Sequence, residues 1–145
     1  MSERLIGILT SSFTKILIPG LKVTIPLTLV SFALSLCIGM ILALVQVANI
    51  KVLKQIARLY IWIFRGTPLL VQLFIIFFGL PSVGIILDAF PAAVIGFGMN
   101  LGAYNAEVFR SAIMAVPKGQ SEAAYLIGLK YPQVLCRVVL PQSFP

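Results

Sequence analysis

The chain has 145 residues, of which 60% are apolar and only 10% are charged, and its mean hydropathy is +1.08. This composition excludes an ordinary soluble globular protein, and the length allows one domain at most. The net charge of +7 could indicate a nucleic-acid partner, but the basic residues gather in particular connections between apolar stretches, which argues against that class.

Three long stretches carry no charged residue: 23–50, 66–87 and 89–106. Each approaches or exceeds the roughly 20 residues that a helix needs to cross the hydrocarbon core of a bilayer. We therefore predict an all-α integral membrane protein, a single domain over residues 1–145. Its transmembrane helices, about three in number, are expected near residues 21–47, 60–80 and 92–113.

Residues 1–18 precede the first predicted span and lead into Pro19 and Gly20. Their apolar side chains recur at roughly helical spacing, so we expect a short interfacial helix that ends at this pair. Small residues recur within the span itself at spacings near four, and they are Thr24, Thr28, Ser35, Gly39 and Ala43. Such a stripe favours close packing against another helix, with a polar path for a solute as the alternative.

The charges predict how the chain lies across the membrane. The basic residues between the first two spans are Lys51, Lys54, Arg58 and Arg65, and those from the end of the third span onward are Arg110, Lys118, Lys130 and Arg137. The connection at 81–91 has neither Lys nor Arg. Because Lys and Arg concentrate in cytoplasmic loops, the first and third connections are predicted inside. The N-terminus is then outside, even though Arg4, Lys15 and Lys22 precede or begin the first span.

The second predicted span follows a basic connection at 49–60 and is interrupted near its start by Arg65, Gly66, Thr67 and Pro68. A glycine and a proline so close together predict an unwound or kinked helix. Arg65 and the nearby Trp62 are interpreted as interfacial anchors, so Arg65 receives no substrate role.

Polar residues crowd into the second half of the third predicted span. Glu107 and Arg110 are three residues apart and share a helix face, so they are expected to form an ion pair. Asn100, Tyr104 and Glu107 also share a face, which could line a polar cavity. The structural role of Glu107 is the preferred interpretation, and contact with a ligand is the alternative.

A segment at 116–142 closes the chain. Pro117 and Gly119 are expected to end the third span, and residues 121–127 are long enough for about two helical turns. Gly128 follows, and a glycine can adopt the left-handed backbone conformation that stops a helix. Tyr131 and Pro132 then start a second short helix that Pro141 is expected to end.

Within this segment, Glu122, Ala123 and Ala124 are followed by Gly128 and then by Val138, Leu140 and Pro141. This spacing resembles the EAA loop of the permeases of bacterial ABC importers, and the stretches FRGTPLLVQLF and NLGAYNAEVFRSAI resemble the permeases for polar amino acids. The resemblance covers about nine-tenths of the chain. An ordinary amphipathic interfacial helix is the alternative for this segment.

The resemblance implies a type I importer in the bacterial cytoplasmic (inner) membrane, with several membrane passes. Its docking residues, which are expected to contact an ATP-binding subunit, are then Glu122, Ala123, Ala124, Gly128 and Pro141. The small side chains of the two alanines would let the partner approach the main chain closely. The implied partners are a second permease subunit, an extracytoplasmic solute-binding protein, an amino acid and membrane lipid. The substrate pathway would include Asn100, Tyr104 and Glu107.

Two further spans normally follow the loop in this family, so the chain is expected to be C-terminally truncated and not to transport alone. A second function therefore stays open: a non-transporting membrane protein that only binds the ATPase, as an assembly or regulatory piece. Enzymatic activity is not expected, because the sequence has neither a phosphate-binding glycine loop nor histidine. With only Cys37 and Cys136 as thiols, neither a metal site, a disulfide nor a cofactor is expected.

Overall fold

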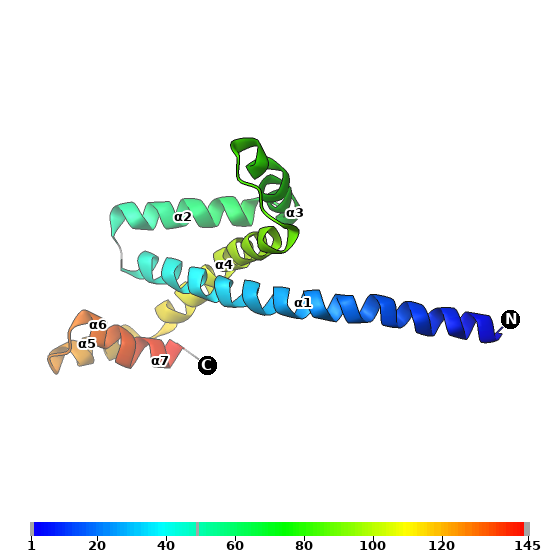
Figure 1. Ribbon diagram of the computed structural model, residues 1–145. Helices are drawn as coiled ribbons and strands as arrows, with labels where there is room; N and C mark the ends of the chain where they lie inside the picture. The colour runs from blue at the N-terminus through cyan, green and yellow to red at the C-terminus, as the bar shows by residue number, and fades with distance from the viewer. Residues whose placement is uncertain (1, 49, 144–145) are drawn as a thin grey trace.

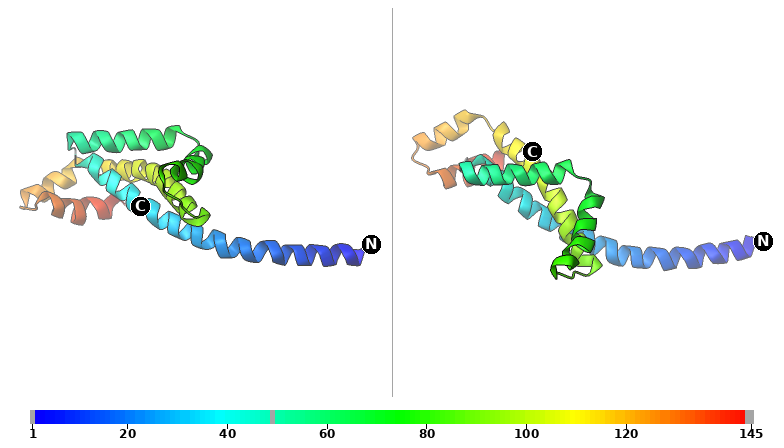
Figure 2. Two further views of the ribbon diagram at one scale, coloured as in Figure 1. Left: turned by 45° about the horizontal axis from the view of Figure 1, so that its top comes forward. Right: turned by 90° about the horizontal axis from the view of Figure 1, so that it is seen from above.

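The computed structural model describes residues 2–48 and 50–143. Throughout these residues the regular structure is helical, which confirms the predicted all-α class. The first helix, α1 (Ser2–Val47), is 46 residues long and therefore about 69 Å in length. Its N-terminal half extends away from the other helices (Figure 1, Figure 2).

The predicted end of a separate interfacial helix at Pro19 and Gly20 is wrong, because α1 continues through both Pro19 and Pro26. Each proline removes one main-chain N–H donor and crowds the carbonyl four residues earlier, which can bend a helix without ending it. The residues on both sides of each proline keep their main-chain helical hydrogen bonds. Two isolated prolines therefore do not stop a helix of this length.

The second predicted span consists of two rods. Helix α2 (Lys51–Gly66) is followed by α3 (Leu69–Phe74), the π turn η1 (Ile75–Gly79) and the 3₁₀ turn η2 (Leu80–Val83). The axes of these two helical segments differ in direction by 105° across the break at residues 67–68, which confirms the predicted break. Residues 51–60 of the predicted basic connection are helical and belong to α2, and Asn49 lies outside the described residues.

Helix α4 (Ala89–Ala115) returns along the C-terminal half of α1 and packs closely on it. A Cβ added at Gly39 would lie 2.6 Å from the Cβ of Asn105, and one at Gly102 would lie 2.7 Å from Ile38. The side-chain amide of Asn105 also donates to Ser35 Oγ at 3.0 Å. Small residues on both helices thus allow the close approach that membrane helices use in place of a hydrophobic driving force.

The predicted stripe of small residues is confirmed in its second half. Ser35, Gly39 and Ala43 are buried against α4, whereas Thr24 and Thr28 lie on the exposed part of α1. Packing is therefore the role of the buried members.

The last segment forms a helix, a turn and a second helix beside the C-terminal end of α1 (Figure 1). It consists of α5 (Lys118–Leu126), α6 (Tyr131–Val134), the π turn η3 (Leu135–Val139) and α7 (Leu140–Ser143). This confirms the predicted helix-turn-helix.

Within the described chain, one continuous helical stretch is long and apolar enough to cross a bilayer, Lys15–Val47. Lys51–Gly66 and Leu69–Val83 reach the same standard together, as the bent pair. Helix α4 has 27 residues, but the polar side chains in its second half make it less apolar than these two. The count of three spans stays a prediction.

Candidate docking loop and polar groove

The turn inside the last segment is fixed by Gly128, whose φ is +89°. The N–H of Leu129 donates to the carbonyl of Ala124 at 3.1 Å, and the N–H of Gly128 donates to that of Tyr125 at 2.9 Å. These two bonds form a Schellman motif, in which a left-handed residue directly after a helix satisfies its last carbonyls. Leu129 also packs near Ala124, the apolar contact that accompanies this motif.

The second helix begins at Tyr131 and Pro132, as predicted. The side chain of Gln133 accepts a hydrogen bond from the N–H of Lys130 at 2.9 Å and so satisfies a donor at the helix start. Pro141, however, does not end this helix, because it lies inside α7. The wide π turn η3 directly before it already interrupts the ordinary hydrogen-bond ladder, so a residue without an N–H is tolerated there.

The two alanines of the motif point in different directions. Ala123 is exposed, but Ala124 is only 5% exposed and packs with Ile113 of α4 and with Val134 and Val139 of the second helix. Ala124 therefore faces the helix bundle, and its contact with an ATP-binding subunit stays a prediction. A small side chain at this position lets α5 approach the second helix closely.

The apolar cluster around Ala124 joins the loop to the helix bundle. The partly buried residues packed against it include Leu44 and Val47 at the end of α1 and Val116 at the end of α4. The loop therefore rests on the last turns of two long helices.

Glu122 lies on the exposed surface of α5, and its carboxylate makes no hydrogen bond or ion pair within residues 2–48 and 50–143. Beside it is a groove of about 350 Å³, whose lining is mostly apolar and includes Tyr125 and Tyr131. Aromatic side chains around an apolar centre are typical of protein interfaces. The arrangement offers a partner protein one carboxylate next to an apolar depression.

The break between α2 and α3 has its own hydrogen-bond network. In a continuous helix the carbonyl of Phe64 would accept from residue 68, but Pro68 has no N–H. Side-chain amides take its place: Gln72 Nε2 donates to the Phe64 carbonyl at 2.9 Å and Asn100 Nδ2 at 3.2 Å. Gln72 and Asn100 also bind each other at 3.1 Å, and Gln72 Nε2 donates to the carbonyl of Thr67.

The structure separates the three residues predicted to share a pathway. Asn100 is buried, and its amide holds the break. Tyr104 and Glu107 instead line an open groove of about 430 Å³ together with Arg58 and Arg65 of α2. The guanidinium of Arg65 lies 5.3 Å from the ring centre of Tyr104, a cation–π contact.

The predicted ion pair is confirmed, since Arg110 Nη2 lies 3.1 Å from Glu107 Oε2. Gln46 at the end of α1 donates to the other carboxylate oxygen at 3.5 Å. Both carboxylate oxygens thus have partners, and α1 and α4 are joined at the same level.

Sequence reasoning missed Gln46, Gln72 and the contact of Arg65 with Tyr104. The two glutamines carried a usable signal, because each is an uncharged polar residue inside an apolar run and must find a hydrogen-bond partner when buried. The position of Arg65 depends on the 105° bend, whose size no local pattern specifies.

Residues 35–145 match the family described as the inner membrane component of binding-protein-dependent transport systems. The chain is 47% identical over 133 residues to the L-cystine transport system permease protein of Bacillus subtilis, a match that covers 92% of this chain and 57% of that protein. It is 39% identical over 129 residues to the arginine transport system permease protein of the same organism, covering 88% and 59%.

A crystal structure of an amino acid ABC transporter with histidines superimposes with a TM-score of 0.82 and 38% identity, covering 92% of this chain and 63% of that one. The chain spans somewhat more than half the length of the curated relatives that it matches. The chain belongs to the family of inner membrane components of binding-protein-dependent transport systems.

Proposed function

We propose that the chain supplies membrane-spanning helices and the docking loop of a permease subunit for ATP-driven amino-acid uptake. The observation that carries this is the placement of the loop: an exposed Glu122 and Ala123 on one side, and an apolar cluster with the ends of α1 and α4 on the other. A segment built in this way can receive a movement from a partner and pass it to the helix bundle. Family membership supports the proposal.

The partners follow from this assignment. An ATP-binding subunit contacts the loop through Glu122, Ala123 and the turn at Gly128, and it carries out the hydrolysis of ATP. Ala124 is buried and shapes the loop from within, whereas Pro141 is exposed in α7 and contributes to the docking surface. A second permease subunit completes the pathway, and an extracytoplasmic solute-binding protein delivers the amino acid. The names of the relatives, which are permease proteins for cystine and arginine, favour transport over a role limited to binding the ATPase.

In the proposed membrane orientation, three spans cross a bacterial inner membrane, the N-terminus lies outside and the docking loop lies in the cytoplasm. The helix bundle supports this, because the C-terminal ends of α1 and α4 meet the loop at one end of the molecule (Figure 2). Reporter fusions after Ser82 and after Gln142 are expected to report opposite sides, and signals from the same side would contradict the orientation.

Tyr104 and Glu107 are proposed to line the substrate pathway from the open groove, while Asn100 contributes by holding the break in shape. The groove offers a guanidinium, a carboxylate and an aromatic ring. These groups suit the charged backbone groups of an amino acid.

Co-purification of the cognate ATP-binding subunit tests the docking proposal. Glu122→Arg reverses an exposed charge and is expected to lower recovery of the subunit at least about tenfold, or about 1.4 kcal/mol. Asp88→Arg makes the same change at an exposed position between η2 and α4 and serves as the matched control. Equal recovery with the Glu122 and Asp88 variants would argue against docking at this loop.

A further inference from the structure

Two arginines of α2 line the open groove that also contains Tyr104 and Glu107 of α4. Arg58 and Arg65 are seven residues apart, so they share nearly the same face of the helix and lie about 10 Å apart along its axis. The volume of about 430 Å³ is within the range of sites for small ligands. Two cations, one carboxylate and one aromatic ring thus surround a single concave space.

Both guanidinium groups are available to a ligand. Arg58 and Arg65 are exposed, and neither makes a hydrogen bond or an ion pair in the part of the chain that the structure describes. The contact of Arg65 with the Tyr104 ring leaves N–H groups of the guanidinium for an oxygen acceptor. Glu107 also attracts Arg65 electrostatically, without forming an ion pair with it.

The carboxylate of Glu107 keeps room for one more donor. Its two oxygens accept from Arg110 and from Gln46, but the bond from Gln46 is long at 3.5 Å. An ionised carboxylate offers about four lone-pair sites, so an ammonium group can still donate to it. A second cation in the groove would find no further carboxylate and would meet the arginines, which is unfavourable.

The backbone of a free amino acid complements this arrangement. Its carboxylate and ammonium groups are attached to the same carbon, so the groups that bind them must be neighbours. Arg65 satisfies this condition, because it is the arginine of α2 whose charge reaches Glu107. A guanidinium and a carboxylate form short, strong hydrogen bonds. Arg58, farther along the helix, is then left for the side chain of the same ligand.

We propose that Arg65 binds the α-carboxylate of the amino acid and that Arg58 selects its side chain. An acidic side chain gains a second guanidinium partner, a neutral one gains none, and a basic one is repelled. The inference rests on the proposed substrate pathway and narrows its substrate class. It gives Arg65 a role in binding beyond the interfacial anchor that the sequence indicated.

Saturation-transfer NMR titrations of the full 145-residue chain in detergent micelles test this site. L-glutamate is expected to bind most tightly, followed by L-glutamine and then by L-arginine. L-glutaminamide has a neutral amide in place of the α-carboxylate of L-glutamine. It should bind at least about tenfold more weakly than L-glutamine, because it loses a hydrogen bond between charged groups.

Two variants separate the roles of the arginines. Arg65→Gln should weaken the binding of all three amino acids at least about tenfold and remove the advantage of L-glutamine over L-glutaminamide. Arg58→Gln should lower the affinity for L-glutamate about three- to fivefold relative to that for L-glutamine, since an exposed ion pair contributes little.

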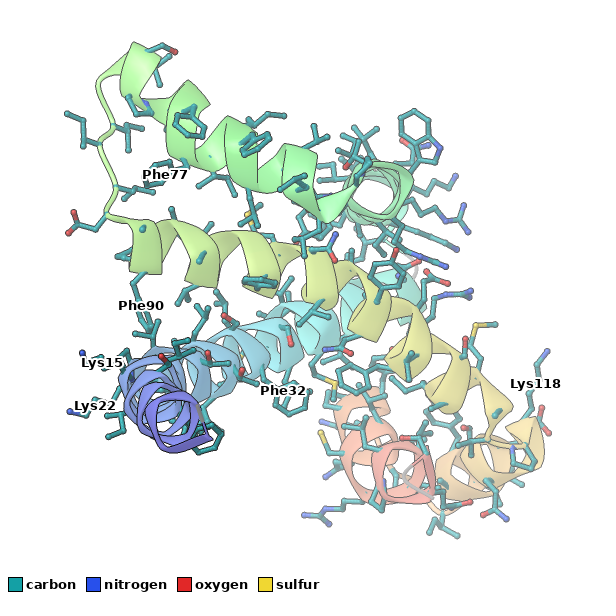
Figure 3. All side chains as sticks on the ribbon, turned by 90° about the vertical axis from the view of Figure 1, so that its right-hand side faces the viewer. Lys15, Lys22, Phe32, Phe77, Phe90 and Lys118 are labelled. Atoms are coloured by element: carbon teal, nitrogen blue, oxygen red, sulfur yellow. The ribbon has the colours of Figure 1, made fainter. Side chains whose placement is uncertain are left out.

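Lys22→Gln is the control, because it also removes one positive charge. Lys22 is exposed on the N-terminal part of α1, away from α2 (Figure 3). The control is expected to bind every probe as the original chain does. Arg65→Lys keeps the charge and should retain more binding than Arg65→Gln, and circular dichroism verifies the fold of each variant.

Several results would overturn the proposal. Equal binding of L-glutamine and L-glutaminamide would show that no group recognises the carboxylate. Binding of acetate as tight as that of L-glutamine would identify a general anion site, and L-arginine binding as tight as that of L-glutamate would remove the role of Arg58. Amino-acid binding that Arg65→Gln leaves unchanged would refute this inference alone. If none of the amino acids binds, the proposed substrate pathway fails with it, while docking of the ATP-binding subunit is judged separately by co-purification.

Discussion

The side-chain amide of Asn100 donates to the main-chain carbonyl of Phe64, which lies 36 residues earlier in the chain, at 3.2 Å. Pro68 leaves this carbonyl free to accept the bond, because it cannot supply the N–H that would bind the carbonyl in a continuous helix, and Gln72 is its second side-chain donor. A polar side chain in the middle of α4 is therefore hydrogen-bonded to the break between α2 and α3. Asn100 stabilises a bend, and the shape of the neighbouring groove depends on it.

Asn100→Leu should destabilise the chain by about 1–3 kcal/mol, because it removes one donor from the Phe64 carbonyl and leaves the Gln72 side-chain oxygen without its partner. The free energy of unfolding in mixed micelles measures this loss. Tyr104→Phe removes a polar group from the exposed side of the same helix and is expected to change stability much less. Equal effects of the two changes would show that the network does not support the bend.

Gly39→Val should disrupt the packing of α1 on α4. Its Cβ would lie 2.6 Å from the Cβ of Asn105 and 3.1 Å from the main-chain nitrogen of Ala106, and a main-chain atom cannot move aside cheaply. A loss of about 1–3 kcal/mol is typical of such overpacking. Gly20→Val adds the same side chain to open space on the same helix. Crosslinking between cysteines placed across the two helices reports the separation, and an unaltered yield in the Gly39 variant would refute the predicted contact.

Gly128→Val places a β-branched residue at a φ of +89°, which costs at least about 1–2 kcal/mol because its Cβ approaches the following carbonyl. The docking loop should open and become more sensitive to trypsin, which cleaves after Lys130 and Arg137. Gly119→Val is a suitable control, since Gly119 lies within α5 and also has open space around it. If trypsin cut both variants at the same rate, backbone conformation at Gly128 would not determine the stability of the loop.

Glu107→Gln separates a structural role from a role in transport. Both members of the Glu107–Arg110 pair are about one-third exposed, and such pairs contribute at most about 1 kcal/mol to stability. The variant should therefore unfold almost like the original chain. If Glu107 lines the pathway, amino-acid uptake by the complete transport system should fall while co-purification of the ATP-binding subunit stays unchanged. Unchanged uptake would assign Glu107 to packing alone.

Local chemistry explains which features the sequence predicted correctly. The break at residues 65–68, the turn at Gly128, the Glu107–Arg110 pair and the family itself depend on residue types at short spacing, and all are confirmed. The small residues of α1 predicted a packed stripe, and the half that meets α4 is packed.

The structure differs from the expectations for two reasons: prolines within helices are better tolerated than expected, and other positions depend on distant contacts. Pro19 did not stop α1, and Pro141 did not stop the last helix, because a single missing donor is less costly than ending a helix that is otherwise supported. The inward direction of Ala124 depends on Ile113 and Val139, which are distant in sequence. Likewise, Asn100 is buried while Tyr104 lines the open groove, and this difference depends on the size of the bend at residues 67–68.

The apolar cluster of Ile113, Ala124, Val134 and Val139 has a consequence for how the chain opens. Elements that share one core tend to exchange their amide hydrogens as a single cooperative unit. The helix-turn-helix segment at 116–142 and the last turns of α1 and α4 share such a core, whereas the N-terminal half of α1 is largely exposed in the described chain. One continuous helix therefore belongs to two regions of different local stability, and the more stable region is the one that carries the loop.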